Sequence, residues 1–237
     1  MFYLLIGLSL SIEVIVSIEA GLLPSIFMWL MFVPAGWVLA WALWQVNAQA
    51  LRQHAELQHI FFMCCFALTV MWSLRAGISS GMGVHFIGLT LATLLMGWPL
   101  AIVCGAVALL GTSCLGVESF QGYGVSFMVS VALPVFTSNT VLRLMQRFLS
   151  ANPFVYIFVG SFFNGAIAMF CVVSTTSILL VSLGVYDWSL VFDQYFIYLP
   201  LMMFPEAFIN GAMVATFVGA TPELLSSFDV DRYFNDD

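Results

Sequence analysis

Two ionisable side chains lie in stretches that are otherwise apolar. His85 follows a run of small residues in SGMGVHFIGLT, and Glu206 follows a proline in FPEAFINGA. A neutral imidazole is a common ligand of transition metals. Because proline frees backbone polar groups, the carboxylate can lie in a kinked, polar pocket within a helical bundle. Both residues are candidates for a ligand site, and both have an ordinary alternative, a hydrogen bond between helices.

Two similar stretches supply further candidates. FFNGAIAM (162–169) and FINGAMVA (208–215) both put Asn-Gly-Ala inside an apolar run. Small residues let helix backbones approach closely, and asparagine forms hydrogen bonds across the contact. We therefore predict that these runs are paired packing surfaces, with Asn210 also in the pocket wall near Glu206. The predicted packing residues are Asn164, Gly165 and Gly211.

The composition places these residues in a membrane protein. Of 237 residues, 62% are hydrophobic and only 7% are charged, whereas soluble domains carry about 25% charged residues. Since no water-soluble core accommodates so much apolar surface, we predict an all-α, polytopic bundle of transmembrane helices surrounded by lipid. Lysine and arginine together number five, so the basic surface that nucleic-acid binding requires is missing.

Apolar runs of the length that crosses a bilayer, about 20 residues, predict six to seven spans. The candidate spans are 24–46, 58–74, 82–98, 100–117, 124–142, 154–185 and 195–220. Only Gly97-Trp98-Pro99 separates the third from the fourth, which predicts a tight turn or a kink. The chain then divides into an uncertain apolar segment (1–19), a transmembrane domain (20–222) and an acidic cytoplasmic tail (223–237).

Arginine placement predicts the orientation, because cytoplasmic loops are enriched in positive charge. The loop 47–57 carries Arg52, and the loop 143–153 carries Arg143 and Arg147. With both loops in the cytoplasm, the C-terminal tail is cytoplasmic too. His85 then lies near the outer end of its span.

The sequence carries no catalytic motif that we can identify. It has no P-loop and no HExxH, so we predict a protein that is neither an ATPase nor another enzyme. The five cysteines lie in apolar runs without CxxC spacing, which is not typical of a zinc site. We expect no resident cofactor.

Three stretches resemble a known family. They are SGMGVHFIGLTLATLLMGWPLAIVCGAVALLG (80–111), GVESFQGYGVSFMVSVALP (116–134) and FPEAFINGAMVATFVGATPELLSSFDVDRYF (204–234). They resemble the CbiM-type substrate-capture membrane proteins of energy-coupling factor transporters for cobalt and nickel. The likeness extends over most of residues 20–234 and is most specific in these three stretches.

This resemblance implies a helical bundle in the bacterial inner membrane that captures Co²⁺ or Ni²⁺ near its outer face, as substrate. ATPase subunits and a scaffold transmembrane subunit would drive transport. In the family, the ion is held by the free amino terminus, a histidine at position two and the histidine matched here by His85. Position two is Phe2 in this chain. The residues that could replace the missing ligand are Glu118, Glu206 and Met82.

Two hypotheses follow from this departure. The first is a transporter subunit that captures a divalent metal with His85 as one ligand. The second is a non-transport membrane protein that keeps the fold without a metal site and acts as an assembly or interaction subunit. Loss of metal binding on replacing His85 would favour the first hypothesis over the second.

Overall fold

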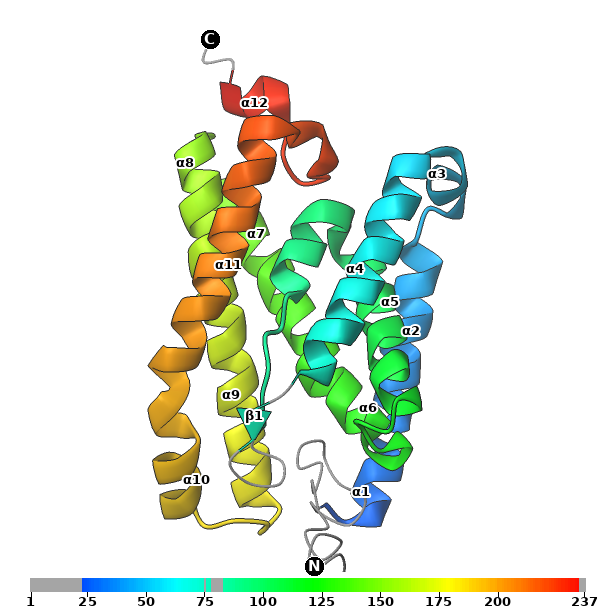
Figure 1. Ribbon diagram of the computed structural model, residues 1–237, viewed down its shortest axis with the longest axis vertical. Coiled ribbons are helices and arrows are strands. Elements are labelled where there is room, and N and C mark those ends of the chain that lie inside the picture. Colours follow the sequence, from blue (N-terminus) through cyan, green and yellow to red (C-terminus); the bar gives the residue numbers. More distant parts are fainter. Residues whose placement is uncertain (1–22, 75, 78–82, 235–237) are drawn as a thin grey trace, which may run out of the picture.

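The chain forms a bundle of membrane-spanning helices in the computed structural model, which describes residues 23–74, 76–77 and 83–234 (Figure 1). Within these residues, six helical stretches are long and apolar enough to cross a membrane. They are Ser25–Gln45, Ala55–Ser73, Leu89–Cys114, Phe120–Phe148, Pro153–Ser182 and Trp188–Ala220. The predicted all-α transmembrane bundle is confirmed. The segment 1–19 and Met82 lie outside the described residues.

Each span is built from one or more helices that follow one another directly. The α-helices in chain order are α1 (Ser25–Leu30), α2 (Phe32–Gln45), α3 (Ala48–Gln53), α4 (Ala55–Ser73), α5 (Leu89–Cys114), α6 (Tyr123–Ser126), α7 (Leu133–Phe148), α8 (Pro153–Val155), α9 (Asn164–Ser182), α10 (Trp188–Gln194), α11 (Leu199–Ala220) and α12 (Val230–Phe234). Wider π-helical turns join them at Phe127–Ala132 and Tyr156–Phe163. Short 3₁₀ turns lie at Phe120–Gly122, Phe196–Tyr198 and Pro222–Leu224.

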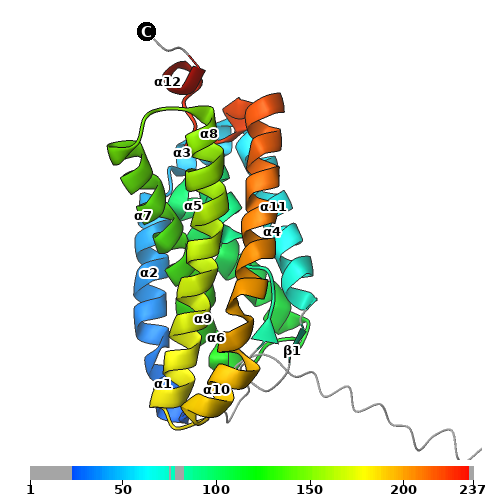
Figure 2. The same ribbon diagram turned by 90° about the vertical axis from the view of Figure 1, so that its left-hand side faces the viewer.

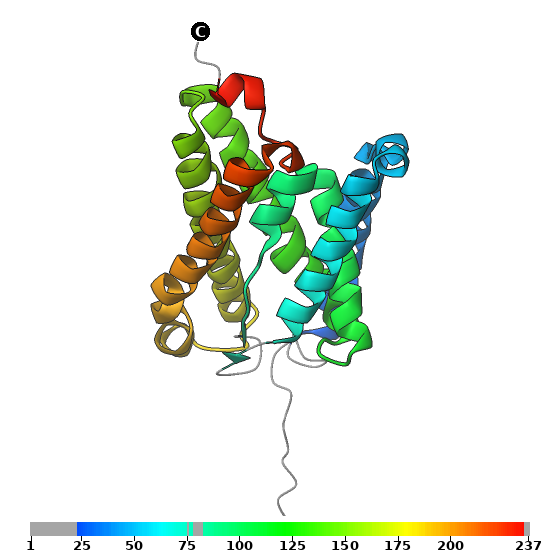
Figure 3. The same ribbon diagram turned by 45° about the horizontal axis from the view of Figure 1, so that its top comes forward.

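A short antiparallel strand pair precedes α5. β1 (Ala76–Gly77) pairs with β2 (Gly83–Val84), with Ala76 opposite Val84. The chain then runs without helix or strand through residues 85–88, which we name the His85 segment. In Figure 1 this stretch rises through the middle of the molecule to the start of α5, and Figure 3 shows it between two groups of helices.

α5 is a helical hairpin. Gly97 interrupts it with φ of 77° and ψ of 162°. A Cβ atom on Gly105 would lie 3.3 Å from the Leu89 side chain, although a straight helix would separate these positions by about 24 Å. The chain therefore reverses at Gly97 and Pro99. We call residues 89–96 the first arm of α5 and residues 98–114 the second arm.

The candidate span 82–98 is not a separate, complete span. Its helical part is only the first arm, because the His85 segment before it is non-helical and Gly97 ends it. An arm of this length measures about 12 Å, whereas the hydrocarbon core is about 30 Å thick. The first arm is thus a half-helix that enters the bundle and turns back. Glycine tolerates the positive φ at the turn, and Pro99 suits the first turn of the second arm.

Apart from Arg75, which lies outside the described residues, the segments that carry arginine gather at one end of the bundle. α3, α8 and α12 lie at this end, whereas α1, β1 and α10 lie at the other (Figures 1 and 2). This arrangement agrees with the orientation predicted from the arginines. The start of the His85 segment, next to β2, therefore lies toward the predicted outer end, and α12 lies at the predicted cytoplasmic end.

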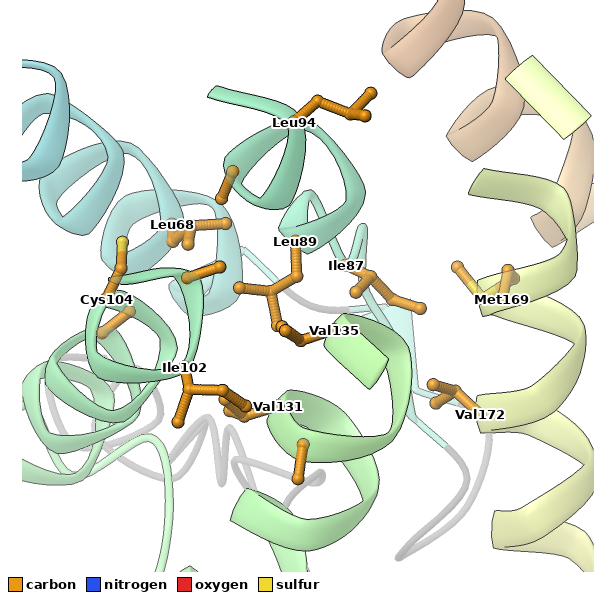
Figure 4. Close-up of a cluster of buried hydrophobic side chains, with 14 of the residues drawn as sticks. Leu68, Ile87, Leu89, Leu94, Ile102, Cys104, Val131, Val135, Met169 and Val172 are labelled. Atoms are coloured by element: carbon orange, nitrogen blue, oxygen red, sulfur yellow. The ribbon is translucent and has the colours of Figure 1, made fainter. Parts of the chain in front are cut away.

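The core surrounds the first arm and Ile87 of the His85 segment. Leu89 and Leu94 of this arm are fully buried, and Ile87 of the His85 segment is almost so. In Figure 4, Ile87 extends toward Met169 and Val172 of α9. Because lipid is as apolar as these side chains, their van der Waals packing, and not removal from water, fixes the half-helix among its neighbours.

The residues after α11 do not form a free tail throughout. Leu225, Phe228 and Tyr233 are buried against the bundle. The exposed residues of the same segment include Glu223, Asp229 and Asp231. In the described part of the predicted acidic tail, the acidic residues therefore lie on the exposed side of a segment whose other side is packed on the bundle.

Candidate metal-capture site

Gly88 ends the His85 segment in a conformation that other residues avoid. Its φ is +66°, and a Cβ atom there would lie 2.7 Å from Met71 Cε and 2.9 Å from Leu68 Cδ2. Both contacts are closer than van der Waals distance, and both partners belong to α4. Only glycine lets the backbone turn into α5 while it lies this close to α4.

Trp72 of α4 binds backbone carbonyl groups of the His85 segment. Its indole Nε1 donates to Phe86 O at 3.0 Å and to Ile87 O at 3.2 Å, and its side chain is completely buried. The His85 ring stands edge-on to the Trp72 ring, with centroids 5.8 Å apart. The same tryptophan therefore fixes the backbone of this segment and one side of the imidazole.

Glu206 of α11 binds backbone amide groups of the His85 segment. Its Oε2 accepts from Ile87 N, and its Oε1 accepts from Gly88 N, both at 2.9 Å. Asn210 Nδ2 donates to the same Oε1 at 2.9 Å. Glu206 is only 1% exposed. Because non-helical backbone at membrane depth needs partners within the protein, this carboxylate supplies what the segment requires.

Asn210 completes the cap of the half-helix. Its Oδ1 accepts from Leu91 N at 2.9 Å, in the first turn of α5. The first amides of a helix have no partner within that helix, and a negative group near them is stabilised by the helix dipole. Glu206 and Asn210, four residues apart on α11, therefore cap α5 from a neighbouring span.

The two Asn-Gly-Ala runs lie close to this cap. A Cβ atom on Gly165 would lie 3.0 Å from Asn210 Nδ2, and one on Gly211 would lie 3.2 Å from Phe162 Cβ. Asn164 Nδ2 donates to Ser138 O and to Gly160 O, each at 3.0 Å. The small residues thus bring α9 and its preceding turn against α11, which places Asn210 beside α5.

The structure brings together only some of the residues singled out in the sequence. His85 belongs to the His85 segment, Glu206 binds that segment, and Asn210 binds the start of α5. Glu118 is buried in the connection between α5 and Phe120–Gly122. Among the described residues, no three His, Cys, Asp or Glu side chains are grouped so as to hold a metal ion. His85 is accordingly the one described residue that we assign as a ligand candidate.

Sequence reasoning missed Trp72. It stands at the end of the predicted span 58–74, where a tryptophan is typical of the membrane interface. Its spacing from His85 carries no motif, because the contact forms only when the strand pair folds the chain back. The backbone amides of the His85 segment were missed for the same reason.

We predict that Trp72→Phe loosens the His85 segment without unfolding the bundle. Phenylalanine keeps most of the buried ring but lacks the N–H that serves two carbonyls, and one lost hydrogen bond costs about 0.5–1.5 kcal/mol. Hydrogen–deuterium exchange of a peptide covering residues 85–91 should accelerate. Trp44→Phe, an exposed change in α2, is the matched control and should leave exchange there unchanged.

Comparison with known proteins identifies relatives of this architecture. The family model described as "CbiM: Cobalt uptake substrate-specific transmembrane region" matches residues 17–224. No curated protein matches the chain in sequence.

Two solved structures share the fold. One, a truncated transition metal transporter, has a TM-score of 0.71 and 17% identity, and the match covers 86% of this chain and 99% of that one. Another, a transition metal transporter, has a TM-score of 0.69 and 17% identity, and the match covers 85% and 92% of the two chains. The family match extends over most of the sequence, and the chain therefore belongs to the CbiM family of cobalt-uptake transmembrane proteins.

Proposed function

We propose that this chain is the membrane subunit of an energy-coupling factor transporter that captures a divalent transition metal, Co²⁺ or Ni²⁺, for uptake. The observation that carries the proposal is the position of His85. It stands on a non-helical segment whose start lies toward the predicted outer end, in a chain of a cobalt-uptake family. The alternative of a non-transport interaction subunit has no comparable support.

The chemistry of the segment suits this role. Imidazole nitrogen is a good ligand for borderline divalent metals such as cobalt and nickel. A ligand binds with less loss of conformational entropy when its backbone is already fixed. Trp72 and Glu206 fix the His85 segment through four hydrogen bonds from two different spans. The backbone that carries His85 is therefore fixed before the ion arrives.

Glu206 serves better as a support than as a ligand. Both of its carboxylate oxygens already accept hydrogen bonds from backbone amides. Withdrawing it to bind a metal would leave those buried amides without acceptors, at a cost of about 1–3 kcal/mol each. We therefore assign the first ligand to His85 and the positioning of its segment to Glu206 and Asn210.

Transport also requires partners. The sequence contains no P-loop, so this chain has no ATPase motif of its own that could supply energy for uptake. ATPase subunits joined to this protein by a scaffold transmembrane subunit fit that requirement.

Calorimetric titration of the detergent-purified protein tests the proposal. Co²⁺ and Ni²⁺ should bind saturably to one site, whereas Mg²⁺ should give no binding heat because it prefers oxygen ligands. Equal response to Mg²⁺ would indicate non-specific charge binding. The absence of saturable binding for both transition metals would contradict the proposed function.

A further inference from the structure

The half-helix that follows His85 is bound at both ends by α11 and the residues after it. At its start, Glu206 and Asn210 accept from the amides of Ile87, Gly88 and Leu91. At the other end of the half-helix, a backbone carbonyl lacks its usual helical donor. In a continuous helix, Leu95 O would accept from the amide of residue 99, but that residue is Pro99, which has no N–H. Leu95 O therefore requires a donor from elsewhere.

The residues just after α11 supply this donor. Ser226 N donates to Leu95 O at 3.2 Å, and Ser227 N donates to Leu94 O at 3.3 Å. Ser227 Oγ also donates to Leu94 O at 2.9 Å. We name residues 225–228 the serine clamp. It binds the tip of the first arm at the end of the molecule where α12 lies.

The serine clamp is itself anchored to the bundle. Ser227 Oγ lies 2.6 Å from Tyr156 OH, and Gln146 Nε2 donates to Ser227 O at 3.3 Å. The Phe228 ring packs against Tyr156, with centroids 4.9 Å apart. These contacts connect the serine clamp to α7 and to the start of the span Pro153–Ser182. Its position therefore depends on how the predicted cytoplasmic ends of several helices are arranged.

We propose that Ser226 and Ser227 are positioning residues for the metal-capture site, acting through the first arm of α5. This inference rests on the proposed function. The first arm is a short rigid helix with the serine clamp at its tip and the His85 segment at its base. A displacement of the clamp shifts the arm and loosens the contacts of the base with Glu206. The predicted cytoplasmic end thereby sets how firmly His85 is held near the outer end.

Hydrogen–deuterium exchange of the full-length, metal-free protein tests this coupling. Ser227→Ala removes the hydroxyl contacts with Leu94 O and Tyr156, and Ser226→Pro removes the donor to Leu95 O. Both should accelerate exchange of a peptide covering residues 85–91 by about fivefold or more, with little change in a peptide from α7. Ser227→Thr keeps a hydroxyl and should restore slow exchange. Thr216→Ala, which removes an exposed hydroxyl on α11, is the matched control and should have no effect.

A Co²⁺ titration of the same variants gives the second readout. Ser227→Ala should raise the dissociation constant by about fivefold, and Ser227→Thr should not. Unchanged exchange at residues 85–91 in both serine variants would overturn the coupling, as would acceleration that is uniform across the bundle. If the wild-type protein binds no metal, the proposed function fails, and the exchange experiment still decides whether the clamp controls the His85 segment.

Discussion

Glu206→Ala should be among the most destabilising single substitutions in this protein. It removes the acceptor for the buried amides of Ile87 and Gly88, and each amide left unsatisfied costs about 1–3 kcal/mol. It also takes the negative group away from the start of α5. Since domains are stable by only about 5–15 kcal/mol, the unfolding midpoint in detergent should fall markedly.

Two variants make this result specific. Glu206→Gln keeps one acceptor oxygen but turns an NH₂ group toward an amide donor, so its midpoint should lie between those of wild type and Glu206→Ala. Glu223→Ala removes an exposed carboxylate near the end of α11, and should change stability by less than about 0.5 kcal/mol. A midpoint for Glu206→Ala within the range of Glu223→Ala would contradict the capping role of Glu206.

His85→Ala should abolish saturable Co²⁺ and Ni²⁺ binding while the bundle remains folded. The substitution removes the proposed imidazole ligand but leaves the backbone hydrogen bonds of the His85 segment in place. The substitution also removes the ring contact with Trp72, and aromatic pairs of this kind contribute about 0.5–1.5 kcal/mol. Calorimetry and thermal unfolding of the same preparation separate the two effects.

His59→Ala is the matched control for this prediction. His59 is exposed on α4 near the predicted cytoplasmic end, so its imidazole should not contribute to a site near the outer end. Metal binding should survive in this variant. Retention of binding in His85→Ala, or its loss in His59→Ala, would place the site elsewhere on the chain.

Hydropathy predicted most of the fold, because each long apolar run must cross the bilayer as a helix. It left open whether residues 82–98 cross the bilayer, and there a non-helical segment and a half-helix share one apolar run. Such backbone is stable in a membrane only when distant residues satisfy it. The partners are Trp72, Glu206 and the serine clamp, which no local pattern connects to this stretch.

The candidate site was predictable in part for the same reason. Residue type alone singled out His85 and Glu206, since an ionisable group in an apolar run needs an explanation. Their distinct roles depend on geometry. Glu206 was a candidate wall or ligand of a pocket, and its bonds to backbone amides show that it caps α5. The role of Asn210 likewise follows from its bond to Leu91 N.

X-ray absorption at the cobalt edge tests the central claim most directly. The measurement would use the full-length protein loaded with one equivalent of Co²⁺, beside His59→Ala and His85→Ala prepared in the same way. Wild type and His59→Ala should show the outer-shell scattering of an imidazole bound to cobalt, and His85→Ala should lack it. A wild-type spectrum without imidazole scattering, or one unchanged in His85→Ala, would contradict the assignment of His85 as a metal ligand.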